Sequence, residues 1–438
     1  MKNIGFFAIS MRLKLLVTAV FISAAVTVSA PDSSNSLIFA QKFSNCIECH
    51  RDLGGELSAP VDAIKKDIHF QYGLSCADCH GGNPDIKTDD YEVAMDKNKG
   101  FKGKPAPQEI PEFCGKCHAS ASYMKKFDPN LQTDQLEQYR TSQHGLLLGK
   151  GDRKVATCIS CHGVHGIVGA KDPLSPVFPS NIVETCGKCH SSKEYMAGYS
   201  IPTDQYEKYR KSVHGRALYE KGDISAPTCN DCHGNHGPMP PGVESIGNIC
   251  GHCHLANWEM FIKSPHKEAY DATNIPECEI CHGNHEILTP DDEMVGTSGK
   301  SLCITCHSPE SKGYRAAGDI RNLIDSLKNS VSEAEAVVKK AASSGMEVGD
   351  AMFSIDEAEH QLTHARALVH TFSVEKIEKS IDEGVSSAQK GLKGGREALA
   401  ELQFRRKGLA ISLFFIAIVA VILYLKIRHR SKVQSASS

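Results

Sequence analysis

Nine copies of the motif C-x-x-C-H constrain this chain more than any other feature. They use all 18 cysteines of the 438 residues, and each one ends in a histidine. From Cys46 to His307 each motif has about 29 residues, which is too few to bury an apolar core of its own. Whatever the motifs bind must therefore supply much of the core. The cysteines pair as Cys46 and Cys49, Cys76 and Cys79, Cys114 and Cys117, Cys158 and Cys161, Cys186 and Cys189, Cys229 and Cys232, Cys250 and Cys253, Cys278 and Cys281, and Cys303 and Cys306.

C-x-x-C-H is the attachment signature of c-type haem, in which the two thiols add to the haem vinyl groups and the histidine binds the iron. Zinc ribbons and disulfide scaffolds also use paired cysteines. Neither needs a histidine directly after the second cysteine nine times out of nine. The sequence thus predicts nine covalently bound haem c groups. Their proximal ligands would be His50, His80, His118, His162, His190, His233, His254, His282 and His307.

A repeat within the array predicts ligands for the opposite face of the haems. A helix with S-x-H at its end, stopped by Gly145 or Gly215, is followed by C-x-x-C-H-G-x-H and a further motif. A histidine three residues after a proximal ligand lies on the proximal side of that haem, so it is expected to serve a neighbour. The seven repeated histidines are His69, His144, His165, His214, His236, His266 and His285.

Seven distal ligands leave two haems unserved. His360 and His364 are four residues apart on one face of a predicted helix, with His370 just beyond, and are predicted to fill the deficit. A solvated or packed helix face is the alternative for this pair. His252 lies inside a C-x-x-C loop and should point away from any second iron, and His429 lies in the C-terminal tail.

Methionine is a rival axial ligand that raises the haem potential. Met124, Met196 and Met260 each lie six residues after a motif histidine, but Met260 falls inside a ligand helix, so the three do not share one phase. We interpret them as packing against haem edges.

The two ends of the chain predict export and anchoring. Residues 1–30 resemble a secretory signal peptide, with an uncleaved anchor as the alternative. Residues 31–314 would form the haem domain. Export is expected because c-type haem is attached outside the cytoplasm.

After the last motif the chain contains no cysteine, and its apolar residues recur at helical spacing over residues 315–405. We predict helices over Asp319–Ala342 and Asp350–His370, and a third from Ser373 to about Arg406, with weak points at Gly384, Gly391, Gly394 and Gly395. A transmembrane helix is predicted over residues 406–427, built on the uncharged run Gly408–Leu425. Residues 428–438 would form a cytoplasmic tail.

The predicted fold class is mainly α with extensive irregular structure: a haem-cored domain, a helical segment and one transmembrane helix. The formal net charge is −3, which gives no indication of nucleic-acid binding.

The motif array, the S-x-H-G helix end and C-H-G-x-H resemble the multihaem c-type cytochromes over residues 46–307. This resemblance implies haems with two histidine ligands, packed closely enough for electron hopping. The helices after the array also resemble, at the level of architecture, the pentahaem nitrite reductases and the octahaem hydroxylamine oxidoreductase-like proteins. The active haem of the nitrite reductases uses C-x-x-C-K, whereas all nine motifs here end in histidine. The small quinol-oxidising multihaem cytochromes differ too, because their anchor is N-terminal.

The predicted function is electron relay in anaerobic respiration by a nonahaem cytochrome c that is anchored in the cytoplasmic membrane and faces the periplasm. Its partners would be a membrane-bound, quinone-linked redox protein and other cytochromes. One alternative is an oxidoreductase of nitrogen or sulfur compounds with one five-coordinate haem. Another is a structural subunit whose haems only connect a partner complex. No acid–base constellation stands apart from the haem ligands, so electron transfer without substrate chemistry is favoured.

Overall fold

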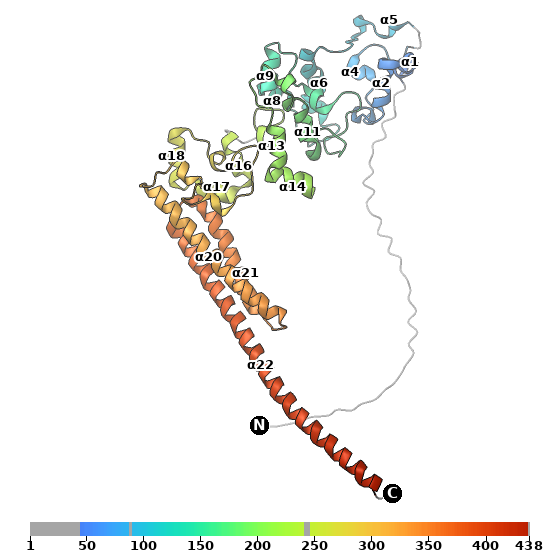
Figure 1. Cartoon of the computed structure of the whole chain (residues 1–438). Helices are drawn as coiled ribbons and strands as arrows, with labels where there is room; N and C mark the ends of the chain where they lie inside the picture. The colour runs from blue at the N-terminus through green and yellow to red at the C-terminus, as the bar shows by residue number, and fades with distance from the viewer. Residues whose placement is uncertain (1–43, 87–89, 241–245, 437–438) are drawn as a thin grey trace, which may run out of the picture.

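The computed structural model describes residues 44–86, 90–240 and 246–436, and the predicted signal peptide lies outside these ranges. The described chain is elongated (Figure 1). Short helices α1 to α19 form one end, three long helices pack beside one another below them, and α22 continues alone towards the C-terminus. The secondary structure of the described residues is helical, without strands, as the sequence predicts.

The haem-motif region consists of short helices joined by irregular segments. Its first half contains α1 (Asn45–Leu53), α2 (Gly55–Ile64), α3 (Ile68–Gln71), α4 (Cys76–His80), α5 (Tyr91–Ala94), η1 (Lys97–Lys99), η2 (Pro107–Glu109), α6 (Ile110–His118), α7 (Ala121–Met124), α8 (Gln135–Thr141), α9 (Gln143–Gly149) and α10 (Cys158–His162). Its second half contains α11 (Pro179–His190), α12 (Lys193–Met196), α13 (Gln205–Lys211), α14 (Val213–Lys221), α15 (Cys229–His233), η3 (Ile246–Asn248), α16 (Cys250–Cys253), α17 (Leu255–Phe261), α18 (Pro265–Thr273), α19 (Glu279–His282), η4 (Asp292–Met294) and η5 (Cys303–Thr305).

Several motifs form a single helical turn with fixed ends. In α4 the hydroxyl of Ser75 and the carboxylate of Asp78 form a capping box, and Gly81 ends the turn at φ 70°. Thr157 and Thr228 begin α10 and α15 in the same way. One turn places cysteines three residues apart on the same face, as attachment to one porphyrin edge requires.

The S-x-H histidines differ from the prediction in one respect. They begin a helix rather than end one, because Ser142 and Ser212 cap α9 and α14 by accepting hydrogen bonds from the amides of Gly145 and Gly215. These glycines do not stop a helix. A Cβ at Gly145 would lie 1.9 Å from the carbonyl oxygen of Tyr139, so glycine is needed for the close approach of α9 to the end of α8.

Apolar side chains form little core around the motifs. The cluster in this region consists of three buried residues, Val183, Leu218 and Ala226, with a few partly buried neighbours. A region of this length that buries so few side chains needs another apolar component, and porphyrins attached at the motifs would supply it.

The main protein core lies in the bundle of α20 (Lys312–Ser343), α21 (Gly349–Leu368) and α22 (Val374–Ala436), with η6 (Val369–Thr371) between the last two. Ile324, Leu327, Ile377 and Ile381 are almost fully buried there.

The glycines of α22 do not interrupt it, contrary to their interpretation as weak points. A Cβ at Gly384 would lie 2.6 Å from Leu327, and one at Gly391 would lie 2.8 Å from Ile355. The glycines therefore let α22 pack closely against α20 and α21.

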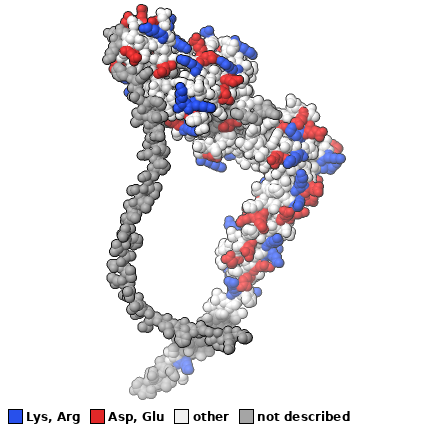
Figure 2. Space-filling view, turned by 180° about the vertical axis from the view of Figure 1, so that it is seen from behind, with Lys and Arg blue, Asp and Glu red and all other residues white. Residues whose placement is uncertain are grey.

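The C-terminal part of α22 fits a single-pass anchor. It contains a segment with a mean hydropathy of 2.8, and none of that segment is buried. Figure 2 shows charged side chains of both signs over the haem-motif region and the bundle, and an uncharged band further along α22. The helix continues through residue 406 without a break, so the boundary between bundle and anchor is one of composition only.

Candidate haem-ligand array

We number the motifs 1 to 9 in chain order and call each a site. At eight sites, the motif histidine faces the ring of a second histidine, with ring centroids 5.8 to 6.3 Å apart. The pairs are His80 with His165 (site 2), His118 with His69 (site 3), His162 with His236 (site 4), His190 with His144 (site 5), His233 with His285 (site 6), His254 with His214 (site 7), His282 with His370 (site 8) and His307 with His266 (site 9).

These separations fit one iron between each pair. An imidazole nitrogen lies about 2 Å from a bound transition metal, so two imidazoles on opposite sides have nitrogens about 4 Å and centroids about 6 Å apart. In the pair of His69 and His118 the two Nε2 atoms lie 3.5 Å apart. The residues therefore fit haem iron with two histidine ligands, and the bound haem would supply one-electron redox chemistry.

Buried histidines of the array favour the neutral form that can bind metal. Burial lowers the pKa of ligands on both sides of the pairs, and like-charged histidine neighbours lower several further. The affected residues are His118, His144, His162, His165, His190, His214, His233, His236, His266, His282 and His285.

The pairing follows two rules. Sites 3, 5, 7 and 9 receive a helix histidine that lies between 40 residues (His214 before His254) and 49 residues (His69 before His118) upstream. Sites 2, 4 and 6 receive the histidine of a C-H-G-x-H sequence that lies two motifs downstream. The seven repeated histidines thus all lie beside motif histidines, and each C-H-G-x-H member lies beside the histidine of a motif other than its own. Their role as iron ligands remains a prediction.

At the C-terminal helices the structure differs from the prediction for His360 and His364. Both are exposed on α21, and Nδ1 of His364 lies 3.2 Å from the Ser380 hydroxyl rather than beside a motif histidine. His370 in η6 faces His282 instead, with ring centroids 6.1 Å apart. The contact of His364 is therefore with α22, whereas η6, which directly follows α21, places His370 beside site 8.

Repetition in the sequence could not identify His370 as a ligand, because this residue lies in the bundle, outside the repeated segments of the array. Its Nδ1 lies 2.9 Å from the carbonyl oxygen of Ala367, so that Nδ1 donates and Nε2 is left for a metal.

His50 of site 1 is the exception. Among the described residues no aromatic ring or second histidine contacts its ring, while its Nδ1 lies 3.3 Å from the carbonyl oxygen of Leu57 in α2. His252, His360, His364 and His429 are the other histidines left outside the pairs, and all four are exposed.

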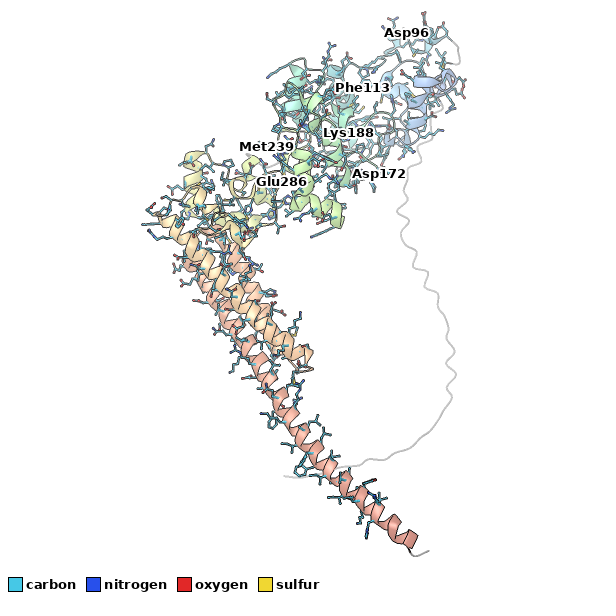
Figure 3. All side chains as sticks on the ribbon, viewed as in Figure 1. Asp96, Phe113, Asp172, Lys188, Met239 and Glu286 are labelled. Carbon is cyan, nitrogen blue, oxygen red and sulfur yellow. The ribbon has the colours of Figure 1, made fainter. Side chains whose placement is uncertain are left out.

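Met124 and Met196 are buried in α7 and α12, where packing against haem edges remains a prediction. Phe113, labelled in Figure 3, lies in the haem-motif region. Its ring packs beside that of His80, with ring centroids 5.7 Å apart.

Contacts between cysteines place consecutive motifs side by side. The thiols of Cys114 and Cys158 interact directly, which raises the pKa of Cys114 and lowers that of Cys158. Cys186 and Cys229 form a second such pair, and Cys278 and Cys250 a third, in which the interaction lowers the pKa of Cys250 to about 7.

The thiols of the remaining neighbouring motifs are close enough to affect one another electrostatically. Burial raises the pKa of Cys76, Cys79, Cys161, Cys232 and Cys281, and a thiol of the adjacent motif raises each of them further. These thiols are Cys46, Cys117, Cys186, Cys250 and Cys303, respectively. Each motif therefore lies beside the next one in the chain, from site 1 to site 9.

Asp67 connects the distal ligands of sites 2 and 3. Its carboxylate accepts hydrogen bonds from Nδ1 of His69 at 2.9 Å and from the amides of Gly166 and Ile167 at 2.7 and 2.9 Å. Although burial raises the pKa of Asp67, these hydrogen bonds lower it to about 2. The same carboxylate thus orients His69 and holds the loop that carries His165, whose φ of 49° needs such support.

Replacing Asp67 with asparagine removes the charge behind His69. We expect the haem potential of site 3 to rise, because a carboxylate bonded to a ligand histidine makes that ligand more basic. We also expect a loss of about 1.5–3 kcal/mol in the free energy of unfolding, the scale for hydrogen bonds to a charged group. Spectroelectrochemical titration and urea unfolding measure the two effects. Asp96→Asn is the matched control, because Asp96 caps η1 through the amide of Asn98 without contacting a histidine. An unchanged set of potentials in Asp67→Asn would contradict this role.

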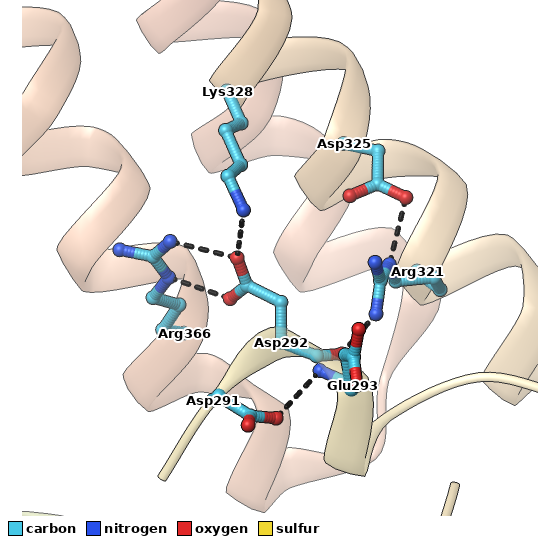
Figure 4. A network of polar contacts seen from close by, with 7 residues as sticks. All are labelled: Asp291, Asp292, Glu293, Arg321, Asp325, Lys328 and Arg366. Carbon is cyan, nitrogen blue, oxygen red and sulfur yellow. Dashed lines mark hydrogen bonds and ion pairs between the residues drawn. The ribbon is translucent and has the colours of Figure 1, made fainter. Parts of the chain in front are cut away.

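Asp292 joins the haem-motif region to the bundle (Figure 4). Its side chain is 9% exposed and accepts two hydrogen bonds of 2.8 Å from Arg366 of α21, while Nζ of Lys328 in α20 lies 3.1 Å away. The bonds from Arg366, followed by those from Lys328, lower the pKa of Asp292. This ion-pair network fixes α21 against the segment just after site 8, and so helps to hold His370 opposite His282.

We expect Asp292→Asn to lower the free energy of unfolding by about 1–3 kcal/mol at neutral pH. The folded-state pKa of Asp292 lies below its ordinary value of 3.8. Its stabilisation is therefore complete above that value and is lost as the pH falls through the folded-state pKa. Chemical unfolding from pH 7 downwards should show the difference between the two proteins shrinking below about pH 4. Lys300→Gln removes an exposed ion pair and should change little at any pH. A difference that stays constant with pH would exclude the carboxylate charge as its cause.

Comparisons with known proteins agree with the array. A family model described as cytochrome c3 matches residues 68–191. The multiheme cytochrome MtrA of Shewanella baltica is 24% identical over 221 residues, which cover 48% of this chain and 52% of MtrA. An uncharacterised protein of Archaeoglobus fulgidus is 28% identical over 94 residues, or 19% of this chain and 32% of that protein. The chain spans about half the length, or less, of these curated relatives.

The chain is a multihaem c-type cytochrome with covalently bound haem, and this confirms the class predicted from the motifs. Electron transfer is the chemistry that bound haem supplies to proteins of this class.

Proposed function

We propose that this protein is a membrane-anchored nonahaem cytochrome c that relays electrons in single file between the membrane and the periplasm. Two observations carry the proposal: the thiols of each motif interact, directly or electrostatically, with those of the next motif from site 1 to site 9, and a pair of histidines occupies eight of the nine sites. Electron tunnelling slows steeply with distance, so a line of neighbouring haems forms a conductor.

The position of the anchored bundle indicates which end of the row of haems would exchange electrons with the membrane partner. Sites 8 and 9 adjoin the bundle, since His282 faces His370 and the chain enters α20 soon after site 9. Site 1 lies at the far end of the haem-motif region (Figure 1). The membrane partner, for which a quinone-linked redox protein is the best candidate, would exchange electrons near sites 8 and 9. Periplasmic or outer-surface cytochromes would meet the opposite end.

Reduction from the membrane tests the relay. The full chain in sealed vesicles would be supplied with its host membrane's quinol-linked reductases and a quinol analogue, and haem absorbance would be followed. We expect quinol to reduce all nine haems, with dithionite defining the full amplitude. Haems that stay oxidised with quinol but are reduced by dithionite would overturn the proposed membrane link.

An oxidoreductase of nitrogen or sulfur compounds is the second candidate, and site 1 is the observation that favours it. The test is to add nitrite, hydroxylamine or sulfite to the protein. The protein is reduced beforehand where the reaction needs an electron donor, and oxidised where it needs an electron acceptor. Catalytic turnover, measured by product formation, would favour the enzyme over the relay.

A further inference from the structure

We propose that the haem of site 1, held by Cys46, Cys49 and His50, has an exchangeable sixth coordination position that binds small iron ligands such as carbon monoxide. The proposal rests on haem loading of the motifs. It goes beyond the relay, because it makes one end of the line a ligand-binding site.

The pairing rule for odd-numbered sites leaves site 1 without a distal histidine. Sites 3, 5, 7 and 9 each take a helix histidine from 40 to 49 residues upstream. For His50 the corresponding positions are residues 1–10, which contain no histidine, and none occurs anywhere before His50. No histidine of this sequence therefore stands at the position that the pairing rule assigns to site 1.

Site 8, near the C-terminal end of the array, obtains its distal histidine from outside the array. By the rule for even-numbered sites its ligand would follow a tenth motif, which the chain does not contain. There the bundle supplies His370. The bundle thus compensates for the missing repeat at the C-terminal end.

The remaining histidines cannot serve site 1. Twelve histidines lie outside the motifs, and eight of them face the motif histidines of sites 2 to 9. His252 lies within motif 7. His360 and His364 lie on the bundle, and His429 lies near the end of α22, far from α1 (Figure 1).

On the proximal side of site 1, His50 is nevertheless oriented so that it can bind the haem iron. His50 lies in α1 and its Nδ1 faces the carbonyl oxygen of Leu57 in α2, across the turn at Gly54 and Gly55, whose φ values are 69° and 58°. A hydrogen bond from Nδ1 to a carbonyl leaves Nε2 to bind iron, the arrangement usual for metal-bound histidine. Cys49 and the side chains of Leu53 and Leu57 are exposed, so small solutes reach this end of the molecule.

These features give site 1 the chemistry of a five-coordinate haem. Carbon monoxide binds ferrous haem where the sixth position is free or weakly held, and two histidine ligands block it. The other eight haems are expected to stay low spin and not to bind carbon monoxide.

Carbon monoxide titration of the reduced full chain tests the inference, with haem content measured as the pyridine haemochrome. We expect one carbon monoxide bound for nine haems, and one high-spin haem in the EPR spectrum of the oxidised protein. The double variant Cys46→Ala/Cys49→Ala should retain eight haems and bind no carbon monoxide. His370→Ala should bind a second equivalent, which calibrates the signal even if the double variant fails to mature.

Nine low-spin haems that bind no carbon monoxide would overturn the inference, because some other group of the chain would then hold the sixth position. A signal that survives in Cys46→Ala/Cys49→Ala would overturn it as well, because it would assign the open position to another site. The result is separate from the vesicle assay. One bound carbon monoxide together with failed reduction by quinol would refute the relay and support the ligand site.

Discussion

Replacing His370 with alanine is expected to convert one haem from low spin to high spin. His370 faces His282, and the other histidines of the bundle lie away from site 8, so alanine leaves that iron with one axial ligand. The change should appear as an added high-spin signal in the EPR spectrum and as an added equivalent of bound carbon monoxide. Because potential follows the axial ligands, the midpoint of one haem should also shift.

Matched variants make the test specific. His360→Ala and His364→Ala alter histidines of the same helical segment that do not face a motif histidine, and both should keep the wild-type spectrum. A new high-spin haem in either of them, together with an unchanged His370→Ala, would restore the ligands predicted from helix periodicity and contradict the pairing described above.

Removing the haem of site 5 is expected to divide the relay into two halves. Cys186→Ala/Cys189→Ala leaves eight haems, four on each side of the gap. In vesicles reduced by quinol we expect four haems to be reduced quickly, at sites 6 to 9, and four slowly, because electrons would have to cross the space of the missing haem. Stopped-flow haem absorbance should therefore show two phases of equal amplitude.

Cys46→Ala/Cys49→Ala is the control for this experiment, since it also leaves eight haems but removes only the end of the line. It should show the same single phase as the wild-type chain. A single phase in Cys186→Ala/Cys189→Ala would mean that electrons enter at several exposed haems or bypass site 5, and the single-file relay would be wrong.

The sequence predicts most of the array because its chemistry is local. Several C-x-x-C-H motifs form a single helical turn, and the serine or threonine before such a turn and the glycine after it are visible in the residues themselves. The seven repeated distal histidines could likewise be found, because equivalent residues recur at equivalent places. Their partners could not, since the pairing of His165 with His80 depends on how distant turns pack.

His370 and Asp67 show where sequence reasoning ends. A pair spaced like His360 and His364 indicates a shared helix face, but the tertiary packing decides which face meets the array. Nothing in the sequence around Asp67 predicts its role, because its partners Gly166 and Ile167 lie about a hundred residues away and reach it only through the fold. In the same way, the glycines of α22 suggest breaks by propensity, whereas tight packing against α20 and α21 requires them.

Locating the nine irons tests the central claim most directly. Anomalous diffraction at the iron edge from crystals of the full chain would give their positions without assuming any ligand. We predict nine irons in one unbranched line that follows the order of the motifs, with site 1 at the end away from the bundle. Two separate clusters, a branched arrangement, or fewer than nine irons would contradict the relay.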